Sequence, residues 1–580
     1  MGEPSIFSLV ERSLDDPDLE YVAISYAWGT EDHTASLTLR GEAGDEILKL
    51  TPSAYEAITT IVSTPDLETG VLYWMDQICI DQQNDAEKSQ QVQMMGDIFQ
   101  RAWRTVIWLG PEDEDTAPAL SLLEEVERII PSNEPGPVKL EMINQTHERI
   151  REIVKAWYGA DILPPTDHPG WRALLRLLRR QWFSRLWTFQ EAVLSSATKQ
   201  IICLGSRQAP LIVLIKVVLL LGFDPRHGIE TTRSRSALYD IAYFARCHVD
   251  KKPVSLFRLL KTNEDHDCGD PRDRIYALLG MVNEAEASSI TVDYSIPVTS
   301  LYKDIARRVI RSQQSLRIAV EAPERNAGGI DLDLPSWVCN WTCGLSVSSI
   351  EYFDSKVAYF KASLGFKYEA GDDDGDRLEA KGRVVDAVRE VIHTPQWNRK
   401  VDLAEQRSQL LSQMLPAVYS ALQKECAETD DASRIQKLVK TLTADGYTRD
   451  VTRNTDWPSD AWAGSTCKKM FELMLRSPES CTKLDGFEER WMALFVTQCD
   501  HVVHRQRLAF LKDFGLAVVP WDAEVGDAVA ILHGSSMPVI LRKVEDEDAY
   551  RMIGICFVDG MMYGERVDWA EEDADVINII

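Results

Sequence analysis

The chain has 580 residues, of which 45% are hydrophobic and 27% are charged, and its formal net charge is -28. Such a length and composition allow several folded domains whose buried cores need no metal ions or disulfides. The excess of 91 acidic over 63 basic residues argues against a general nucleic-acid-binding protein, because phosphate contacts require clustered lysine and arginine.

The N-terminal 20 residues are polar and acidic and contain no apolar signal core. The 11 cysteines are scattered and odd in number, which is typical of reduced intracellular thiols. We therefore expect a cytoplasmic protein. The longest apolar run, residues 211–223, contains Lys216 and is shorter than the roughly 20 residues of a membrane-spanning helix. It predicts a buried helix.

The first elements along the chain predict a strand, a hairpin and a helix. Residues 21–27 form an apolar run that ends before Gly29 and predicts a buried strand. Residues 36–39 and 47–50 flank a glycine-containing turn and predict a hairpin. Thr51-Pro52 then predicts the start of a helix, with threonine as the cap and proline at the first helical position.

Strands and helices alternate over the following stretch. The pattern predicts a second strand at 71–80, a third at 105–109, a long helix at 171–195 and a short strand at 200–204. Such alternation is typical of an α/β fold with a doubly wound parallel sheet. Sheets of this kind bind ligands beyond the carboxyl ends of their strands.

The composition divides the chain into four predicted regions. The first, 1–205, is the α/β domain, and the second, 206–330, is helical. The third, 331–500, is mixed and mostly helical, with a strand near 377–391. The last, 501–580, is a small C-terminal antiparallel β module, because its short strand runs are separated by glycine-containing turns.

Three sequence blocks in the first region resemble the fungal heterokaryon-incompatibility (HET) family. They are Tyr21-Val-Ala-Ile-Ser-Tyr-Ala-Trp-Gly29, Trp74-Met-Asp-Gln-Ile-Cys-Ile-Asp-Gln82 with its continuation to Gly110, and Arg180-Gln-Trp-Phe-Ser-Arg-Leu-Trp-Thr-Phe-Gln-Glu191. The resemblance implies a self/non-self recognition or cell-death effector that acts with protein partners or as a homo-oligomer.

A weaker resemblance links the same region to TIR domains. Ile24-Ser25-Tyr26, Asp76 and Trp187-Thr-Phe-Gln-Glu191 occupy positions similar to TIR motifs, although the spacing before Glu191 is one residue longer. Some TIR domains cleave NAD with a glutamate at that position. The resemblance therefore implies a TIR-like fold, NAD as a substrate rather than a bound cofactor, and Glu191 as the catalytic residue.

The residues around Glu191 allow both a catalytic and a structural interpretation. In one continuous helix, Phe183, Trp187 and Glu191 would share a face, and Trp187 would stack on a ligand ring. A carboxylate there would stabilise the positive charge of an oxocarbenium-like transition state. In the structural interpretation, Glu191 pairs with Arg185 and Trp187 belongs to the core.

Four further residues are candidates for binding the substrate. Ser25 and Tyr26 end the first strand, and Trp28 follows it. Asp76 lies among apolar residues of the second strand, where a buried carboxylate needs a partner. A structural role for Asp76 is at least as plausible at this point. No metal site is expected, because the cluster Cys499, His501 and His504 lacks a fourth ligand.

Two functions from different classes remain open from the sequence. The first is enzymatic: cleavage of NAD that depletes the cell. The second is a non-enzymatic module that triggers death through homotypic or partner interactions, and it requires only an exposed adhesive surface.

Overall fold

The computed structural model describes most of the chain, and its residues form two compact units, 1–296 and 297–580. The domain end expected at residue 205 falls inside the first unit. The described residues are 6–30, 32–41, 44–64, 72–129, 164–165, 167–221, 233–320, 330–342, 360–371, 375–392, 415–425, 431–442, 499, 502 and 506–580.

A five-stranded sheet forms the centre of the first unit, in the order β4-β1-β5-β6-β7. The first four of these strands are parallel and the last is antiparallel to its neighbour. This confirms the predicted parallel sheet and the strands expected at 21–27, 105–109 and 200–204. The strand bounds are β1 Tyr21–Tyr26, β4 Leu72–Trp74, β5 Arg104–Trp108, β6 Gln200–Leu204 and β7 Arg207–Pro210.

The strand order of this sheet reverses its direction at β1. From β1 the chain crosses to β4 on one side, and then returns to β5 on the other side of β1. The direction of winding therefore reverses between β1 and β5. In open α/β sheets, ligands bind at the carboxyl ends of the strands that flank such a reversal.

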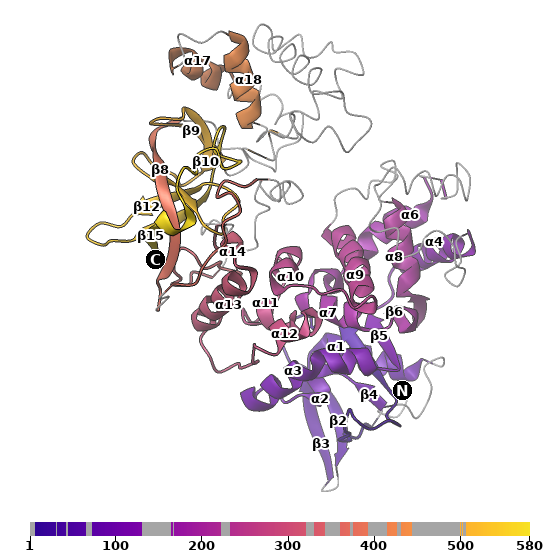
Figure 1. The fold of residues 1–580 in the computed structure, drawn as a ribbon. Coiled ribbons are helices and arrows are strands. Elements are labelled where there is room, and N and C mark those ends of the chain that lie inside the picture. Colours follow the sequence, from indigo (N-terminus) through magenta and orange to yellow (C-terminus); the bar gives the residue numbers. More distant parts are fainter. Residues whose placement is uncertain are drawn as a thin grey trace. The chain divides into compact units, whose positions relative to one another are not determined.

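Helices cover both faces of the sheet (Figure 1). On one face, α1 (Pro52–Ser63) and the hairpin of β2 (Ala35–Gly41) and β3 (Gly44–Leu50) pack against alternate residues of β1. On the other face, α3 (Asp85–Arg101) packs against Tyr21 and Ala23. The predicted hairpin and the capped helix start are confirmed, since the Thr51 side chain accepts a hydrogen bond from the Ala54 amide.

The strand predicted at 71–80 is wrong beyond Trp74. The chain turns there into a short helix, α2 (Asp76–Cys79), with the Cys79 amide donating to the Met75 carbonyl. The Asp76 carboxylate accepts a hydrogen bond from the Gln77 amide at 2.7 Å and so favours the turn. Asp76 therefore sits at the end of β4 rather than on a strand face with Ile78.

The single helix predicted at 171–195 is also wrong. It is divided into α6 (Pro169–Leu177), a 3-10 turn η2 (Gln181–Ser184) and α7 (Leu186–Leu194). The breaks fall at Arg180 and Arg185, whose backbones are extended, with ψ of 145° and 139°. Phe183 consequently does not share a helical stripe with residues of α7.

The rest of the first unit is helical, as predicted, where it is described. Phe189 of α7 packs edge-on against Phe244 of α9, with ring centroids 5.8 Å apart. No helix in the described residues is both long and apolar enough to cross a membrane. The helix bounds are α4 Thr116–Ile129, α8 Leu211–Leu221, α9 Arg233–Val249, α10 Leu256–Thr262, α11 Asp273–Tyr276 and α12 Glu284–Ala287, with 3-10 turns η3 Ala197–Lys199 and η5 Leu279–Met281.

The second unit is built around an eight-stranded, largely antiparallel sheet in the order β11-β12-β13-β15-β8-β9-β10-β14. An additional pairing of β11 with β8 closes part of the sheet on itself. The bounds are β8 Leu378–Ile392, β9 Gln506–Leu511, β10 Leu516–Pro520, β11 Ala528–Leu532, β12 Val539–Lys543, β13 Tyr550–Ile555, β14 Phe557–Val558 and β15 Asp575–Ile579.

The predicted C-terminal antiparallel sheet and the strand predicted near 377–391 are both confirmed, and the structure joins them in one sheet. Strand β8 is long enough to pair with β15, β11 and β9 in turn. The sequence reading missed β9 and β15. The described helices of this unit are α13 (Val298–Gln313), α14 (Arg317–Val320), α17 (Leu415–Glu425) and α18 (Asp431–Leu442), and the remaining predicted helical residues of 402–500 lie outside the described residues.

Candidate functional site

Polar side chains converge at the carboxyl end of β1, where the winding of the sheet reverses. The Tyr26 hydroxyl donates to Asp76 Oδ1 at 2.8 Å, and the Trp28 indole donates to Asp76 Oδ2 at 2.7 Å. The Asp76 carboxylate therefore joins the end of β1 to the end of β4. Three of the five predicted binding residues are thus in direct contact.

The segment between α6 and α7 closes over the same strand end. The Trp182 indole donates to Ser25 Oγ at 2.8 Å, and Arg185 Nη1 donates to the Tyr26 carbonyl at 2.9 Å. The Arg185 guanidinium also lies 5.3 Å from the centroid of the Trp28 ring. The break in the predicted helix is what allows Arg185 to reach β1, because an extended backbone turns its side chain toward the strand.

Glu191 of α7 belongs to this cluster and is buried, with 5% of its surface exposed. The pKa of Glu191 is raised to about 8, mainly by burial and also by the Asp76 charge, although the Ser25 hydroxyl and Arg185 act in the opposite direction. Its Oε2 atom is buried and has no hydrogen-bond partner. A carboxyl group in this state holds its proton at neutral pH and gives it up readily when a cation approaches.

The pKa of the Tyr26 hydroxyl lies well above its usual value, mainly because of burial and then because of the neighbouring Asp76. Tyr26 is therefore a fixed neutral donor. The cluster as a whole combines one releasable proton on Glu191, an acceptor carboxylate on Asp76 and one cation on Arg185. Arg185 was considered in the sequence only as a structural partner of Glu191, and the structure adds it to the site.

Trp187, the remaining predicted binding residue, lies apart from the cluster. Its indole donates to Asp273 Oδ2 at 2.9 Å, and the Tyr294 hydroxyl donates to Asp273 Oδ1 at 2.5 Å. The side chain packs with the α3 core on the other face of the sheet. Trp187 therefore anchors α7 to the segment 267–294.

Substituting Trp187→Ala is expected to destabilise the first unit by about 3 kcal/mol, because a large side chain and the hydrogen bond of a buried carboxylate are both lost. In urea denaturation of the full chain, the first unit of the variant should unfold at a lower urea concentration than that of the wild-type protein. Trp187→Phe, which keeps the ring but not the donor, should lose less. An unchanged midpoint together with weakened NAD binding would contradict this structural role.

Among the described residues, no three histidine, cysteine, aspartate or glutamate side chains are grouped closely enough to hold a metal ion. His501 and His504 of the weak Cys-His-His pattern lie outside the described residues. Cys79 lies next to the cluster, and burial raises the pKa of its thiol to about 11, which is unsuited to a nucleophile.

Two protein families match separate stretches of the chain, one in each unit. Residues 21–191 match the heterokaryon incompatibility protein (HET) family, and residues 421–576 match the Het-6 β-barrel domain. The chain is 24% identical over 637 aligned positions to heterokaryon incompatibility protein 6, OR allele, of Neurospora crassa, covering 96% of this chain and 91% of that protein. No solved structure matches the chain.

The first match begins at Tyr21, the start of β1, and ends at Glu191, so it encloses every residue of the cluster. The second contains the strands from β9 to the start of β15. The alignment with the Neurospora crassa protein spans both matched regions of this chain. The chain is therefore a fungal heterokaryon-incompatibility (HET) domain protein.

Proposed function

We propose that this protein acts in heterokaryon incompatibility as a cytoplasmic effector whose first unit cleaves the N-glycosidic bond of NAD. One observation carries the proposal: a buried glutamate with an unpartnered carboxyl oxygen, Glu191, lies at the carboxyl end of β1 beside Asp76 and Arg185. Buried carboxyl groups with strongly shifted pKa values concentrate at functional sites.

The position of the cluster supports a nucleotide substrate. It lies where the winding of a parallel sheet reverses, which is the usual ligand position in open α/β folds. A TIR-like arrangement of the first unit, which we also propose, has its glutamate at the same place. Trp28, half-buried at the edge of the cluster, would provide the aromatic surface for a base.

The reaction is a hydrolysis. Water attacks the anomeric carbon of the nicotinamide ribose, the carbon–nitrogen bond breaks, and nicotinamide leaves with the bonding electron pair. ADP-ribose and one proton are the other products. The transition state resembles an oxocarbenium ion, so an ionised carboxylate beside the ribose lowers its energy. Glu191 would supply that charge, and Asp76 would accept hydrogen bonds from ribose hydroxyls.

The ionisation of Glu191 would be coupled to substrate binding. In the unliganded protein, burial keeps the proton on the carboxyl group. The nicotinamide ring of NAD carries a positive charge, and an opposite charge within a few ångströms lowers the pKa of a carboxyl group. Substrate binding would therefore favour the charged form that catalysis requires.

A non-enzymatic assembly module is the second candidate, and the closure of the cluster favours it. Ser25 is 1% exposed and Tyr26 is 2% exposed, so the substrate has to open the site before it binds. The β2–β3 hairpin carries Ile47, which is 69% exposed, and offers an apolar contact for a partner or a second copy.

Expression of Glu191→Gln in a fungal host separates the two candidates. If NAD cleavage is the function, wild-type protein lowers cellular NAD and kills, whereas the variant does neither. Glu124→Gln, at a side chain that is 72% exposed, is the matched control and should behave as wild type. Cell death with normal NAD levels in the Glu191→Gln strain would eliminate the enzymatic proposal and leave the assembly module.

A further inference from the structure

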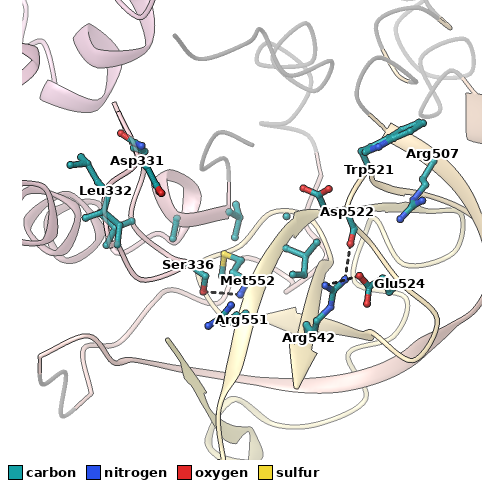
Figure 2. A pocket seen from close by; sticks show the side chains of 17 residues that line it. Asp331, Leu332, Ser336, Arg507, Trp521, Asp522, Glu524, Arg542, Arg551 and Met552 are labelled. Atoms are coloured by element: carbon teal, nitrogen blue, oxygen red, sulfur yellow. Dashed lines mark hydrogen bonds and ion pairs between the residues drawn. The ribbon is translucent and has the colours of Figure 1, made fainter. Parts of the chain in front are cut away.

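The second unit contains a pocket of about 510 Å³ that has no part in the cluster at β1 (Figure 2). Its volume is in the range of sites that hold small molecules or short peptide segments. It is lined by α14, the segment 331–340, strands β9, β12 and β13, and the loop 521–524. Figure 2 shows Arg507 and Trp521 on one side and Asp331 on the opposite side.

One of the three arginines in the pocket is already committed to the protein. Arg542 Nε donates to Asp527 Oδ1 at 2.9 Å, and its Nη1 lies 3.1 Å from Glu524 Oε1. Its Nη2 also donates to the Asp522 carbonyl at 2.6 Å. Arg542 is therefore part of the wall and has little charge left for a ligand.

Neither of the other two arginines forms an ion pair within 4 Å among the described residues, in contrast to Arg542. The Nε atom of Arg507 is buried and has no hydrogen-bond partner, although its Nη2 donates to the Ala523 carbonyl. Burial lowers the pKa of Arg507, which marks it as a poorly solvated cation. Arg551 is exposed and makes no hydrogen bond or ion pair with the described residues.

Two carboxylates that line the pocket also form no ion pair with the described residues. Neither Asp331 nor Asp522 has an ion-pair partner for its carboxylate among the residues that the structure describes, and both line the pocket. With Glu524, the pocket holds three acidic side chains against three arginines. A polyphosphate ligand needs an excess of cations. The pocket has equal numbers of acidic and basic side chains, and the net charge of the chain is -28, so a polyphosphate is disfavoured. A ligand that carries both signs fits better.

The pocket also follows the side of a strand. Residues 551–554 of β13 line it, and β13 pairs with β15 only at Tyr550 within the described strands. Beyond that position, the Met552 amide donates to the Ser336 hydroxyl at 2.9 Å rather than to a strand. An extended peptide in the pocket would therefore lie between the side chains of β13 and those of the segment 331–340.

We propose that this pocket binds an extended peptide segment of a partner protein that carries at least one acidic and one basic side chain. The peptide carboxylate would contact Arg507 and Arg551, and its cation would contact Asp331 and Asp522. The Trp521 ring, whose centroid lies 5.5 Å from the Arg507 guanidinium, would cover its apolar part. The inference is independent of NAD cleavage, because the pocket belongs to the other unit.

A library of blocked hexapeptides randomised over aspartate, lysine, alanine, serine and valine, passed over immobilised full-length protein, tests this assignment. The retained peptides should contain both aspartate and lysine. For an isolated retained peptide, Arg551→Ala and Asp331→Ala should each weaken binding by about tenfold, because each removes one charge partner. Arg377→Ala, at an exposed arginine outside the pocket lining, should leave the affinity unchanged.

Three results would overturn the proposal. The first is retention of peptides of one charge sign only, and the second is no enrichment at all. The third is displacement of the retained peptide by ATP, together with loss of ATP binding in the Arg551→Ala protein. That result would identify a nucleotide site. Circular dichroism of each variant shows whether it is folded, and Arg551 is exposed enough for its loss to leave the fold intact.

Discussion

A fragment that ends at residue 205 is expected to be unfolded, whereas a fragment of residues 1–296 is expected to fold. The reason is that α7, which carries Glu191, is held by residues that follow the sheet in sequence. Without them the Trp187 indole loses its acceptor, Asp273, and one face of α7 is exposed to water.

Four further contacts tie α7 to the later part of the unit. The Leu186 amide donates to the Asp267 carbonyl at 2.9 Å, and the Asp267 amide donates to the Ser184 carbonyl at 2.6 Å. Gln190 Oε1 accepts a hydrogen bond from the Gly280 amide at 3.0 Å. A side chain at Gly280 would meet that same Gln190 oxygen at 2.8 Å, so the Gln190 side chain lies directly against the Gly280 backbone. Phe189 supplies the fourth contact, against α9.

Circular dichroism and thermal denaturation of the two fragments check this prediction. The longer fragment should unfold in one cooperative transition, and the shorter one should show none. A cooperative transition for residues 1–205 would contradict the account.

Replacing Glu191 by glutamine is expected to stabilise the first unit at neutral pH. Burial raises the pKa of this carboxyl group from 4.5 to about 8. Below about pH 4.5 the folded and unfolded states both hold the proton. Between those two values the unfolded state releases it while the folded state keeps it, so the stability of the wild-type protein falls as the pH rises.

The size of the expected stabilisation follows from the shift in the pKa of Glu191. At pH 7 the free energy of unfolding of the wild-type protein is about 3 kcal/mol lower than in acidic solution, because it falls by about 1.4 kcal/mol for each pH unit above 4.5. Glutamine has no proton to release, and its amide keeps contact with the Ser25 hydroxyl. The variant should therefore be more stable at pH 7 and 8 by a few kcal/mol, and the two proteins should converge near pH 4.5.

Urea denaturation of residues 1–296 at pH 5, 7 and 8.5 provides the measurement. Glu124→Gln, at an exposed side chain, should show no such pH-dependent difference. A Glu191→Gln protein that is less stable than wild type at pH 8.5 would show that the carboxylate is paired and stabilising, as in the structural interpretation of the sequence.

Much of the first unit is predictable because local signals and tertiary packing agree there. The apolar run of β1, the Thr51-Pro52 cap of α1 and the hairpin before it all read correctly from the sequence. The sequence also assigns Ser25, Tyr26, Trp28, Asp76 and Glu191 to one candidate site, and in the structure these side chains meet at one strand end. Parallel strands bring their carboxyl ends to one edge whatever their exact length.

The errors arise where tertiary contacts override periodicity. The apolar run at 71–80 looks like a strand, but the Asp76 carboxylate satisfies the Gln77 amide and turns the chain into α2. Residues 171–195 have helical spacing throughout, yet Arg185 becomes extended because Ser184 and Leu186 pair with Asp267. Nothing in the local sequence around Trp187 shows that its partner lies 86 residues away.

Incubation of purified full-length protein and of residues 1–296 with NAD, followed by measurement of free nicotinamide, tests the central proposal most directly. Nicotinamide should form with ADP-ribose in equal amounts, and the Glu191→Gln proteins should be slower by about a hundredfold or more. Folded wild-type proteins that release no more nicotinamide than the Glu191→Gln proteins, at any concentration tested, would contradict NAD cleavage by the first unit.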